Sequence, residues 1–342
     1  MVVEAAKRSR ARLAIVFCVV VATGGGCMRR SSLPASLADR DFWSLIETLS
    51  EPAGTFALSD NVVSNEPHYA DTVHWLRPGG GAYLGVGPEQ NFSYIVGLRP
   101  AMAFVIDIRR ENLDLHLMYK ALFELSTDRA DFVSRLFSRP RPRDLSAGVG
   151  VDEMFSRYDT VAASAEQYKE TVALVRARLI STRSLPLPAA DLDWIETTLG
   201  VFFTSGPGID YYGSNTVNAV RPSYRQLMTA RDFSGVSQGF LATEEGFRFV
   251  KDLHTRNLIV PVVGDFGGPS AMRRVGDYVR GHSDVVYAIY GSNVGAYLTS
   301  QQTRAFCRNL ESLPAASPAW FIDSHGRRSL QAKLRTCPSD TN

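Results

Sequence analysis

Two glycines and an aspartate in this sequence have the types and the spacing of a nucleotide-binding unit. Gly85 and Gly87 interrupt one apolar run, and a second apolar run over residues 103–106 ends at Asp107. Because glycine lacks a Cβ atom, such a loop can turn sharply with positive φ and let a ligand lie against bare backbone. Asp107 follows Gly85 by 22 residues (107 − 85), so its carboxylate is expected at the end of the adjacent strand, within reach of a ribose diol. The pattern predicts the first half of an α/β unit that binds a nucleotide-like cofactor.

The glycine loop departs from the pattern that binds dinucleotides. Gln90 replaces the third glycine of that pattern, and Glu89 lies where the following helix would accept a phosphate. A carboxylate at this point repels a phosphate and tolerates a cationic ligand. The loop is therefore not expected to bind a pyrophosphate. The alternative to a cofactor loop is a structural glycine turn in an ordinary α/β domain.

Two adjoining segments carry a resemblance to a known family. The sequence GVGPEQNFSYIVGLRPAMAFVIDIRREN, followed by HLMYKALFELS, resembles an uncharacterised family described as methyltransferase-like. The segments SNE (Ser64 to Glu66) and VVGDF (Val262 to Phe266) belong to the same resemblance, which covers roughly residues 42–298. A glycine loop without a phosphate grip, combined with an acidic strand end, is similar to that of the class I S-adenosylmethionine-dependent methyltransferases.

The resemblance implies a doubly wound, Rossmann-like methyltransferase sheet with a helical insertion, and S-adenosylmethionine as the cofactor. This cofactor has a ribose, an adenine, a sulfonium and an ammonium group, and no phosphate. The cofactor-binding candidates near the loop are Gly85, Gly87, Glu89 and Asp107. In the resembled enzymes an acid at a later strand end meets the adenine amine, which implies that role for Asp265, after the apolar run over residues 258–263. The alternative for Asp265 is an N-cap of the helix expected over residues 271–280.

Several polar and aromatic residues are candidates for contacts with a substrate. The strand expected over residues 285–290 is followed by polar side chains, and active sites gather at the carboxyl ends of such strands. The polar stretch before the glycine loop could close over a ligand, or it could serve in Asx turns and helix caps. Two adjacent tyrosines in a glycine-rich turn over residues 206–213 could stack on an acceptor, or they could belong to a surface loop. The candidates are Asn65, Glu66, Tyr211, Tyr212, Tyr290, Ser292 and Asn293, and the methyl acceptor itself is unknown.

The order of the expected strands and helices predicts an α/β domain in two halves, which would position these residues. The chain has 342 residues, of which 45% are hydrophobic and 21% charged, as is ordinary for a globular protein. The expected regions are a signal peptide over 1–27, a helical lead-in over 28–75, the first half of the α/β domain over 76–143, a helical insertion or cap over 144–235, the second half over 236–300, and a C-terminal tail over 301–342.

Composition and motifs argue against several classes of function. A net charge of +2 with scattered basic residues gives no electrostatic footprint for nucleic acid. The six histidines are isolated in the sequence, so no Cys/His spacing suggests a metal site. No Gly-x-Ser-x-Gly elbow indicates a hydrolase. Methyl transfer from a sulfonium mainly requires that two reactants are positioned and water is excluded, so it is compatible with the lack of a triad.

Residues 1–27 have the composition of an export signal. Basic residues at positions 7, 8, 10 and 12 precede an apolar run over residues 13–22, and Cys27 follows three glycines. The run is too short for a membrane-spanning helix, which needs roughly twenty residues, and is typical of a secretory signal peptide. Cys27 resembles the lipidated cysteine of bacterial lipoproteins, although Gly24 replaces the usual aliphatic residue. Simple cleavage and a short uncleaved anchor are the alternatives to lipidation.

The export signal and the cofactor lead to three hypotheses about function. The predicted location is a membrane-anchored, exported lipoprotein, and a cytoplasm-facing, membrane-associated protein is the alternative. Because S-adenosylmethionine is cytosolic, the chain is either a methyltransferase with access to that cofactor or an exported lipoprotein that uses the fold as a non-catalytic binding or scaffold module. A dinucleotide-dependent oxidoreductase is a third hypothesis, which Glu89 and the missing glycine disfavour. Cys307 and Cys337 could pair in an oxidising compartment or remain two buried thiols.

Overall fold

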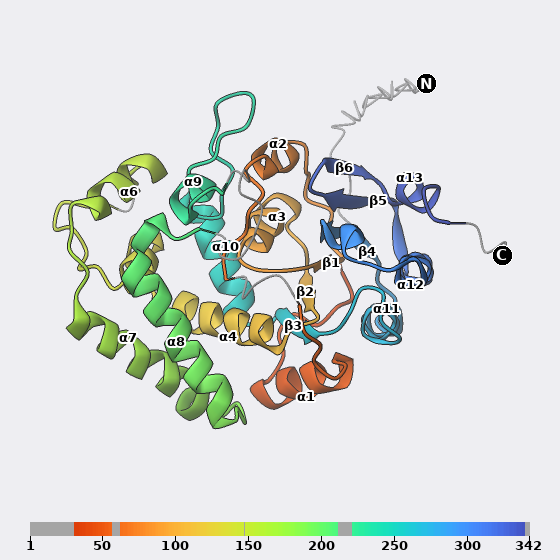
Figure 1. The fold of residues 1–342 in the computed structure, drawn as a ribbon, viewed down its shortest axis with the longest axis horizontal. Coiled ribbons are helices and arrows are strands. Elements are labelled where there is room, and N and C mark those ends of the chain that lie inside the picture. The colour runs from red at the N-terminus through yellow and green to blue at the C-terminus, as the bar shows by residue number, and fades with distance from the viewer. Residues whose placement is uncertain (1–30, 57–61, 147, 211–220, 339–342) are drawn as a thin grey trace, which may run out of the picture.

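The protein has a mixed α/β fold built on one six-stranded sheet (Figure 1). The computed structural model describes residues 31–56, 62–146, 148–210 and 221–338. The strand order is β3-β2-β1-β4-β5-β6, and neighbouring strands are parallel except for β5 and β6, which pair antiparallel. The strands are β1 (Ala82–Gly85), β2 (Met102–Asp107), β3 (Ile259–Val263), β4 (Val286–Ser292), β5 (Ala315–Asp323) and β6 (Gly326–Ser329).

The order of the strands reverses at β1. The chain passes from β1 to β2 and then to β3 on one side, whereas β4 and β5 lie on the other side. Leu84 of β1 therefore pairs with Phe104 of β2 and with Ile289 of β4. Strands β1, β2 and β3 are buried along their whole length, as parallel strands are when helices cover both faces of a sheet. The expectation of an α/β fold with a mostly parallel sheet is confirmed.

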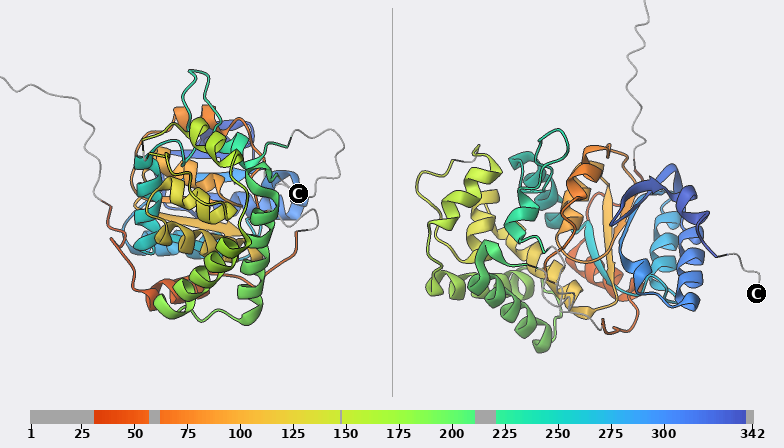
Figure 2. Two further views of the ribbon diagram at one scale, coloured as in Figure 1. Left: turned by 90° about the vertical axis from the view of Figure 1, so that its left-hand side faces the viewer. Right: turned by 45° about the horizontal axis from the view of Figure 1, so that its top comes forward.

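Helices lie on both sides of the strands (Figure 2). Helix α4 packs against β2 and β3, and α1 and α11 pack against β3 and β2 respectively. Helix α5 begins after Asp128, whose side chain accepts the Asp131 N–H at 2.8 Å and so satisfies one free donor of the first turn. The helices around the sheet are α1 (Asp39–Leu49), α2 (Tyr69–His74), α3 (Gln90–Leu98), α4 (Arg110–Leu125), α5 (Arg129–Phe137), α10 (Glu244–Thr255), α11 (Ala271–Gly281), α12 (Ser300–Ser312) and α13 (Leu330–Leu334).

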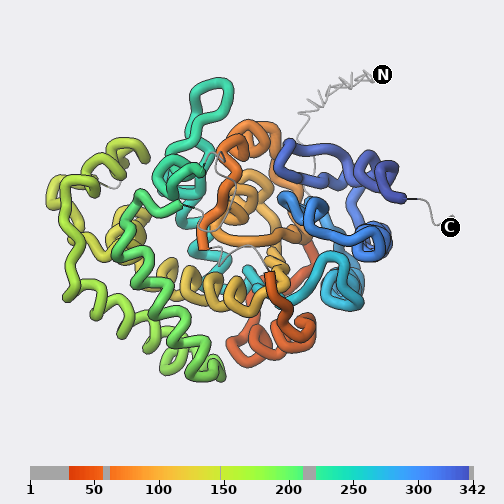
Figure 3. The backbone as a smooth tube through the Cα atoms, viewed as in Figure 1, coloured from red at the N-terminus to blue at the C-terminus, as the bar shows by residue number. Residues whose placement is uncertain are grey.

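The expected insertion over residues 144–235 is helical in its described part. It lies at the side of the molecule away from β5 and β6 (Figure 3), and its helix α8 packs against α4 and α5. Its elements are α6 (Val151–Asp159), α7 (Ala165–Ala177), the π-helical turn η1 (Arg178–Thr182), α8 (Ala189–Ser205), the 3₁₀ turn η2 (Gly206–Gly208) and α9 (Tyr224–Met228).

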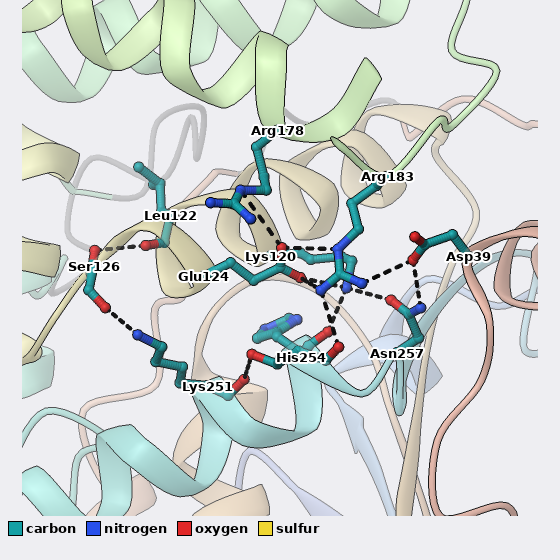
Figure 4. A network of polar contacts seen from close by, with 11 residues as sticks. Asp39, Lys120, Leu122, Glu124, Ser126, Arg178, Arg183, Lys251, His254 and Asn257 are labelled. Carbon is teal, nitrogen blue, oxygen red and sulfur yellow. Dashed lines mark hydrogen bonds and ion pairs between the residues drawn. The ribbon is translucent and has the colours of Figure 1, made fainter. Parts of the chain in front are cut away.

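A buried network of charges joins the insertion to the α/β unit (Figure 4). Glu124 of α4, whose side chain is 3% exposed, lies 2.8 Å from the Lys120 ammonium and 2.9 Å from the guanidinium of Arg183, which follows η1. Arg183 also reaches Asp39 of α1 at 3.0 Å, and Lys120 donates to Asn257 Oδ1 at 2.5 Å. Burial lowers the pKa of Lys120 to about 8. Four segments that are distant in sequence therefore depend on one cluster of side chains.

The region expected as a C-terminal tail over residues 301–342 contains elements of the sheet instead. Helix α12, strands β5 and β6 and helix α13 all lie in it, and β5 pairs with β4. Several residues of β5 are exposed, so it lacks the continuous apolar run that reveals a buried parallel strand in a sequence. Cys307 and Cys337 form a disulfide that ties the segment after α13 to α12. Among the described helices, none is both long enough and apolar enough to cross a membrane.

Candidate functional site

The carboxyl ends of four adjacent strands surround a cavity of about 380 Å³. Its lining consists of residues 86–88 after β1, residues 107–109 at the end of β2, residues 264–266 after β3 and the end of β4, among others. Ligand sites in proteins commonly have volumes of roughly 300–1,000 Å³ and, in open α/β sheets, lie at this edge. We call this space the strand-end cavity.

The two glycines of the loop have different roles. Gly87 has a φ of +75°, lines the strand-end cavity, and has no atom within 4 Å of the place where a Cβ would be. Gly85 ends β1 without a positive φ and is not part of the cavity lining. A Cβ on Gly85 would lie 1.8 Å from Oδ1 of Asn91 and 2.6 Å from the hydroxyl of Tyr83. The expectation that both glycines supply positive φ beside a ligand is therefore wrong for Gly85, whose missing side chain makes room for Asn91.

Asn91 holds the glycine loop in place. Its Nδ2 atom lies 2.9, 3.0 and 2.7 Å from the carbonyl oxygens of Val86, Gly87 and Pro88, and its Oδ1 accepts the Tyr83 hydroxyl at 2.8 Å. His116 of α4 adds a contact of 2.9 Å from Nε2 to the Gly87 carbonyl. Burial lowers the pKa of His116 to about 4, so the ring is neutral near pH 7 and donates from Nε2. The loop is thus fixed by side chains from both helices that follow β1 and β2.

Asp107 lines the strand-end cavity, but it is not a free carboxylate. Its Oδ1 accepts the backbone N–H of Arg109 at 3.0 Å and the Nε–H of the same residue at 3.2 Å. The Nη2 atom of Arg109 lies 3.4 Å from Oδ2, at the limit of a hydrogen bond. Asp107 therefore carries a positive partner, and Oδ2 keeps most of its capacity to accept a hydroxyl. Arg109 stands in the quoted DIRREN segment, yet its role was not recognised in the sequence.

Asp265 lines the same cavity from the neighbouring strand end, since Asp107 pairs with Val263 of β3. Its Oδ1 accepts the Gly267 N–H at 2.8 Å, and its Oδ2 accepts from Gln302 Nε2 at 3.2 Å. Asp265 does not cap helix α11. That role belongs to Glu51, which accepts the backbone N–H groups of Ser270 at 2.6 Å and Ala271 at 2.5 Å. A carboxylate at a helix N-terminus is favourable because it faces the positive end of the helix dipole.

Glu89 does not face the strand-end cavity. Its side chain is fully buried, and both of its oxygens lie 3.2 Å from the backbone nitrogen of Ser64. Burial raises the pKa of Glu89 to about 7. The expectation that this carboxylate meets a cationic ligand in the loop is wrong, since it instead fastens the segment around Ser64 to the start of α3.

A second polar group lies at the end of β4. Ser292, which has a φ of +45°, donates a hydrogen bond from its hydroxyl to Glu66. Gln90 Nε2 lies 3.1 Å from the other oxygen of Glu66 and 3.1 Å from the Tyr290 hydroxyl. Burial raises the pKa of Glu66 above its ordinary value of 4.5. Ser292 and Tyr290 line the strand-end cavity, whereas Glu66 lies behind Ser292 and lines a neighbouring cavity.

The structure brings together most of the residues that the sequence predicted. Those that line the strand-end cavity are Asn65, Gly87, Asp107, Asp265, Tyr290, Ser292 and Asn293. Tyr211, Tyr212 and Cys27 lie outside the described residues. Further lining residues were not predicted from the sequence, among them Thr55, Phe56, Arg109, Tyr297, Leu298 and Gln302. Within the described part of the chain, no group of three or more His, Cys, Asp or Glu side chains is arranged to hold a metal ion.

Comparison with known proteins gives a family without an assigned activity. No curated protein matches the chain at a significant level. A family model described as "Domain of unknown function (DUF7790)" matches residues 61–336, which include the glycine loop and all four strand ends of the cavity. Because this match covers most of the 342 residues, the chain belongs to the family described as a domain of unknown function, DUF7790.

Proposed function

We propose that the protein is an S-adenosylmethionine-dependent methyltransferase-like protein with a doubly wound, Rossmann-like sheet. The observation that carries this proposal is the position of the strand-end cavity, which lies at the carboxyl ends of four parallel strands on both sides of β1, where the strand order reverses. In open α/β sheets that point is where ligands bind. The acidic end of β2 in the same cavity adds a group that accepts ribose hydroxyls.

The chemistry of the cavity lining fits this cofactor. Asp107 would accept from the ribose hydroxyls through Oδ2, and Asp265 would accept from the adenine amine. Because Gly87 has no side chain, the space beside its backbone is open to a ligand. The rest of the lining includes the apolar or aromatic side chains Val86, Ile108, Phe266, Val294 and Leu298. The rings of Phe56 and Tyr297 pack edge-on, with their centroids 4.9 Å apart, and Tyr297 is 42% exposed.

A bound S-adenosylmethionine would supply an electrophilic methyl group on its sulfonium. The contribution of the chain is to hold the cofactor and a second reactant in place and to exclude water between them. The lining carries two carboxylates, Asp107 and Asp265, and one guanidinium, Arg109. This balance favours a ligand with net positive charge over a phosphate-bearing dinucleotide.

Calorimetric titration tests the proposal. Wild-type protein is titrated with S-adenosylmethionine and S-adenosylhomocysteine, beside Asp107→Ala and the matched control Asp193→Ala, whose exposed side chain lies on the remote helix α8. We expect micromolar binding by the wild type and the control, and affinity lower by about tenfold or more in Asp107→Ala, because a hydrogen bond to a charged group contributes about 1.5–3 kcal/mol. A folded wild type that binds neither compound would overturn the proposal.

A second candidate is an exported lipoprotein that uses the same fold as a non-catalytic binding or scaffold module. The Cys307–Cys337 disulfide favours it, because disulfides form and persist mainly in oxidising compartments outside the cytosol. The basic and apolar residues before Cys27 support the same location, with anchoring to the membrane through the N-terminal segment or through a lipid on that cysteine.

Cell fractionation with Cys27→Ser as the paired variant tests the second candidate. We expect the wild type in the membrane fraction, accessible from outside the cytoplasm, and the variant released from the membrane. A membrane-bound wild type with an oxidised disulfide and no affinity for S-adenosylmethionine would support the module. A wild type found in the cytosol with reduced thiols would contradict it.

A further inference from the structure

A second cavity of about 830 Å³ adjoins the strand-end cavity. Helix α2, the side chain of Tyr94 from α3 and the turn between β5 and β6 line it, and we call it the α2 cavity. Asn65 lines both cavities. The α2 cavity is large enough for a small organic molecule by the usual range of ligand-site volumes.

One hydrogen-bonded pair stands between the two cavities. The hydroxyl of Ser292, which lines the strand-end cavity, donates to the carboxylate of Glu66, which lines the α2 cavity. A ligand in the α2 cavity that contacts Glu66 is thus separated from the strand-end cavity by the width of a single side chain. A transfer between two bound molecules needs their reacting atoms roughly 3–3.5 Å apart, so it would require the Ser292 side chain to turn aside from between them.

Glu66 differs from the other carboxylates of the α2 cavity in its partners. Asp323 forms an ion pair with Arg328, and Asp71 accepts the backbone N–H of Phe233 at 2.8 Å. The partners of Glu66 are neutral donors, and no cation among the described residues forms an ion pair with it. A carboxylate that is largely removed from water and lacks a cation is stabilised by a positively charged ligand.

The lining of the α2 cavity indicates what such a ligand carries besides its charge. Three carboxylates line it (Glu66, Asp71 and Asp323) against one guanidinium, that of Arg327. Three aromatic side chains, Tyr69, Tyr94 and Trp75, also line the cavity, and Trp75 is 49% exposed. Aromatic rings pack against apolar or aromatic groups and attract cations through their faces.

We propose that the α2 cavity binds a small aromatic amine, with its ammonium group beside Glu66. If the proposed function is correct, on which this part of the inference rests, the amine is the methyl acceptor. An ammonium has no lone pair, so it must lose one proton before its nitrogen can attack a methyl group. Glu66 accepts that proton, which converts the ammonium and the carboxylate to a neutral amine and a carboxylic acid. The nitrogen lone pair would then form an N–C bond to the methyl group as the S–C bond of the sulfonium breaks, which leaves S-adenosylhomocysteine and a methylated ammonium.

The groups around Glu66 favour this exchange. Burial raises the pKa of Glu66, and the neighbouring carboxylate of Asp323 raises it further, so that the carboxylate becomes a better proton acceptor. The hydroxyls of Tyr83, Tyr94 and Tyr290 also face this region, and burial raises each pKa well above the ordinary value of 10.0. These tyrosines therefore stay neutral near pH 7. His68 and His325 complete the titratable lining of the α2 cavity.

Calorimetry with tyramine tests the proposal, with tyrosol as a neutral control because it carries a hydroxyl in place of the amine. In Glu66→Gln we expect affinity for tyramine to fall by about tenfold or more, while affinity for tyrosol changes by less than about twofold. The control is Asp193→Ala, whose exposed side chain lies on helix α8 outside both cavities, and it should bind tyramine as the wild type does. Absence of tyramine binding, or equal losses in both variants, would overturn the proposal.

Proton exchange provides a readout that a merely structural role of Glu66 would not change. Tyramine titrations in phosphate and in Tris, which differ in ionisation enthalpy, count the protons released on binding. We expect the wild type to release protons and to bind more tightly as the pH rises through the raised pKa of Glu66, because Glu66 must be ionised to pair with the ammonium. Glu66→Gln should lose this dependence, and a wild type without proton release would contradict the inference.

Titration of the same variants with S-adenosylmethionine separates the two proposals. Glu66→Gln is expected to keep its affinity for S-adenosylmethionine, because Glu66 lies outside the strand-end cavity. A wild type that binds tyramine through Glu66 but does not bind S-adenosylmethionine would refute the proposed function and keep the amine site. Binding of S-adenosylmethionine without Glu66-dependent binding of tyramine would refute the amine site alone.

Discussion

The Oδ1 atom of Asn91 occupies the space that any side chain on Gly85 would need. A Cβ placed on Gly85 lies 1.8 Å from that oxygen, and the same Asn91 holds three carbonyl groups of the loop that borders the strand-end cavity. The identity of Gly85 is thus set by contacts inside the protein. Gly87, two residues later, is open on the side where a Cβ would stand and is constrained by its φ of +75°.

Alanine substitution distinguishes the two glycines. We expect Gly85→Ala to lower the free energy of unfolding by about 1–3 kcal/mol through overpacking against Asn91, and to weaken cofactor binding because the loop shifts. Gly87→Ala should cost about 1–2 kcal/mol from its left-handed backbone conformation alone. Urea unfolding measures both changes. Because Asn91 is the obstacle, the double variant Gly85→Ala with Asn91→Ala should lose less than the sum of the single losses, and strict additivity would contradict this explanation.

Glu89 gives the stability a dependence on pH. Burial raises the pKa of Glu89 from 4.5 to about 7. The contribution of the protonated side chain to the free energy of unfolding is therefore complete below about pH 4.5 and is lost as the pH rises through about 7. We expect a loss on the order of 3 kcal/mol over this interval, which Glu89→Gln should remove. Unfolding in urea at a series of pH values measures it, with Glu166→Gln on the exposed face of α7 as the control. Parallel pH profiles for the wild type and Glu89→Gln would refute the assignment.

The buried charge network should carry more stability than ion pairs on the surface. Glu124→Ala leaves Lys120 and Arg183 without their carboxylate in a buried site, and we expect a loss of about 3–5 kcal/mol. The matched control is Glu153→Ala, which breaks an exposed i,i+4 pair with Arg157 and should cost less than about 1 kcal/mol. Chemical unfolding followed by circular dichroism compares them. Equal losses would mean that the network does not secure the insertion.

The disulfide should stabilise the C-terminal part of the sheet. Cys307 and Cys337 are 30 residues apart, and closing a loop of this size in the unfolded chain contributes about 3–4 kcal/mol in the chain-entropy account. We expect the double variant Cys307→Ser, Cys337→Ser to unfold at a lower temperature than the oxidised wild type. Dithiothreitol should lower the melting temperature of the wild type to that of the variant and leave the variant unchanged. A wild type insensitive to the reductant would contradict the prediction.

The first half of the sheet was predictable because its signals are local. The apolar runs of β1 and β2, the glycine loop between them and the acid at Asp107 all lie within about 25 residues, and each depends on its near neighbours. The strand ends at Asp265 and Ser292 followed from the same reasoning, since apolar runs precede both. The sequence therefore located the strand ends that meet at the cavity, although not what binds in it.

Contacts between distant segments were not predictable from one sequence. Glu51 caps a helix that begins 220 residues later, and Glu66 meets Ser292 across 226 residues, so nothing near either residue indicates its partner. The guanidinium of Arg109 donates to Asp107 because the backbone turns after β2, and the sequence does not show that turn. Strand β5 was missed because its exposed residues break the apolar pattern. The sequence placed Glu89 in the ligand site because it gives no measure of burial.

The contact between Glu51 and the start of α11 also fixes when the fold can be completed. At synthesis rates of about 5–20 residues per second, Ala271 follows Glu51 out of the ribosome after roughly ten to forty seconds. During that interval the segment before β1 has no partner for its carboxylate, and the wall of the strand-end cavity at Asp265 has not yet been made. The fold is therefore completed only after most of the chain has been synthesised.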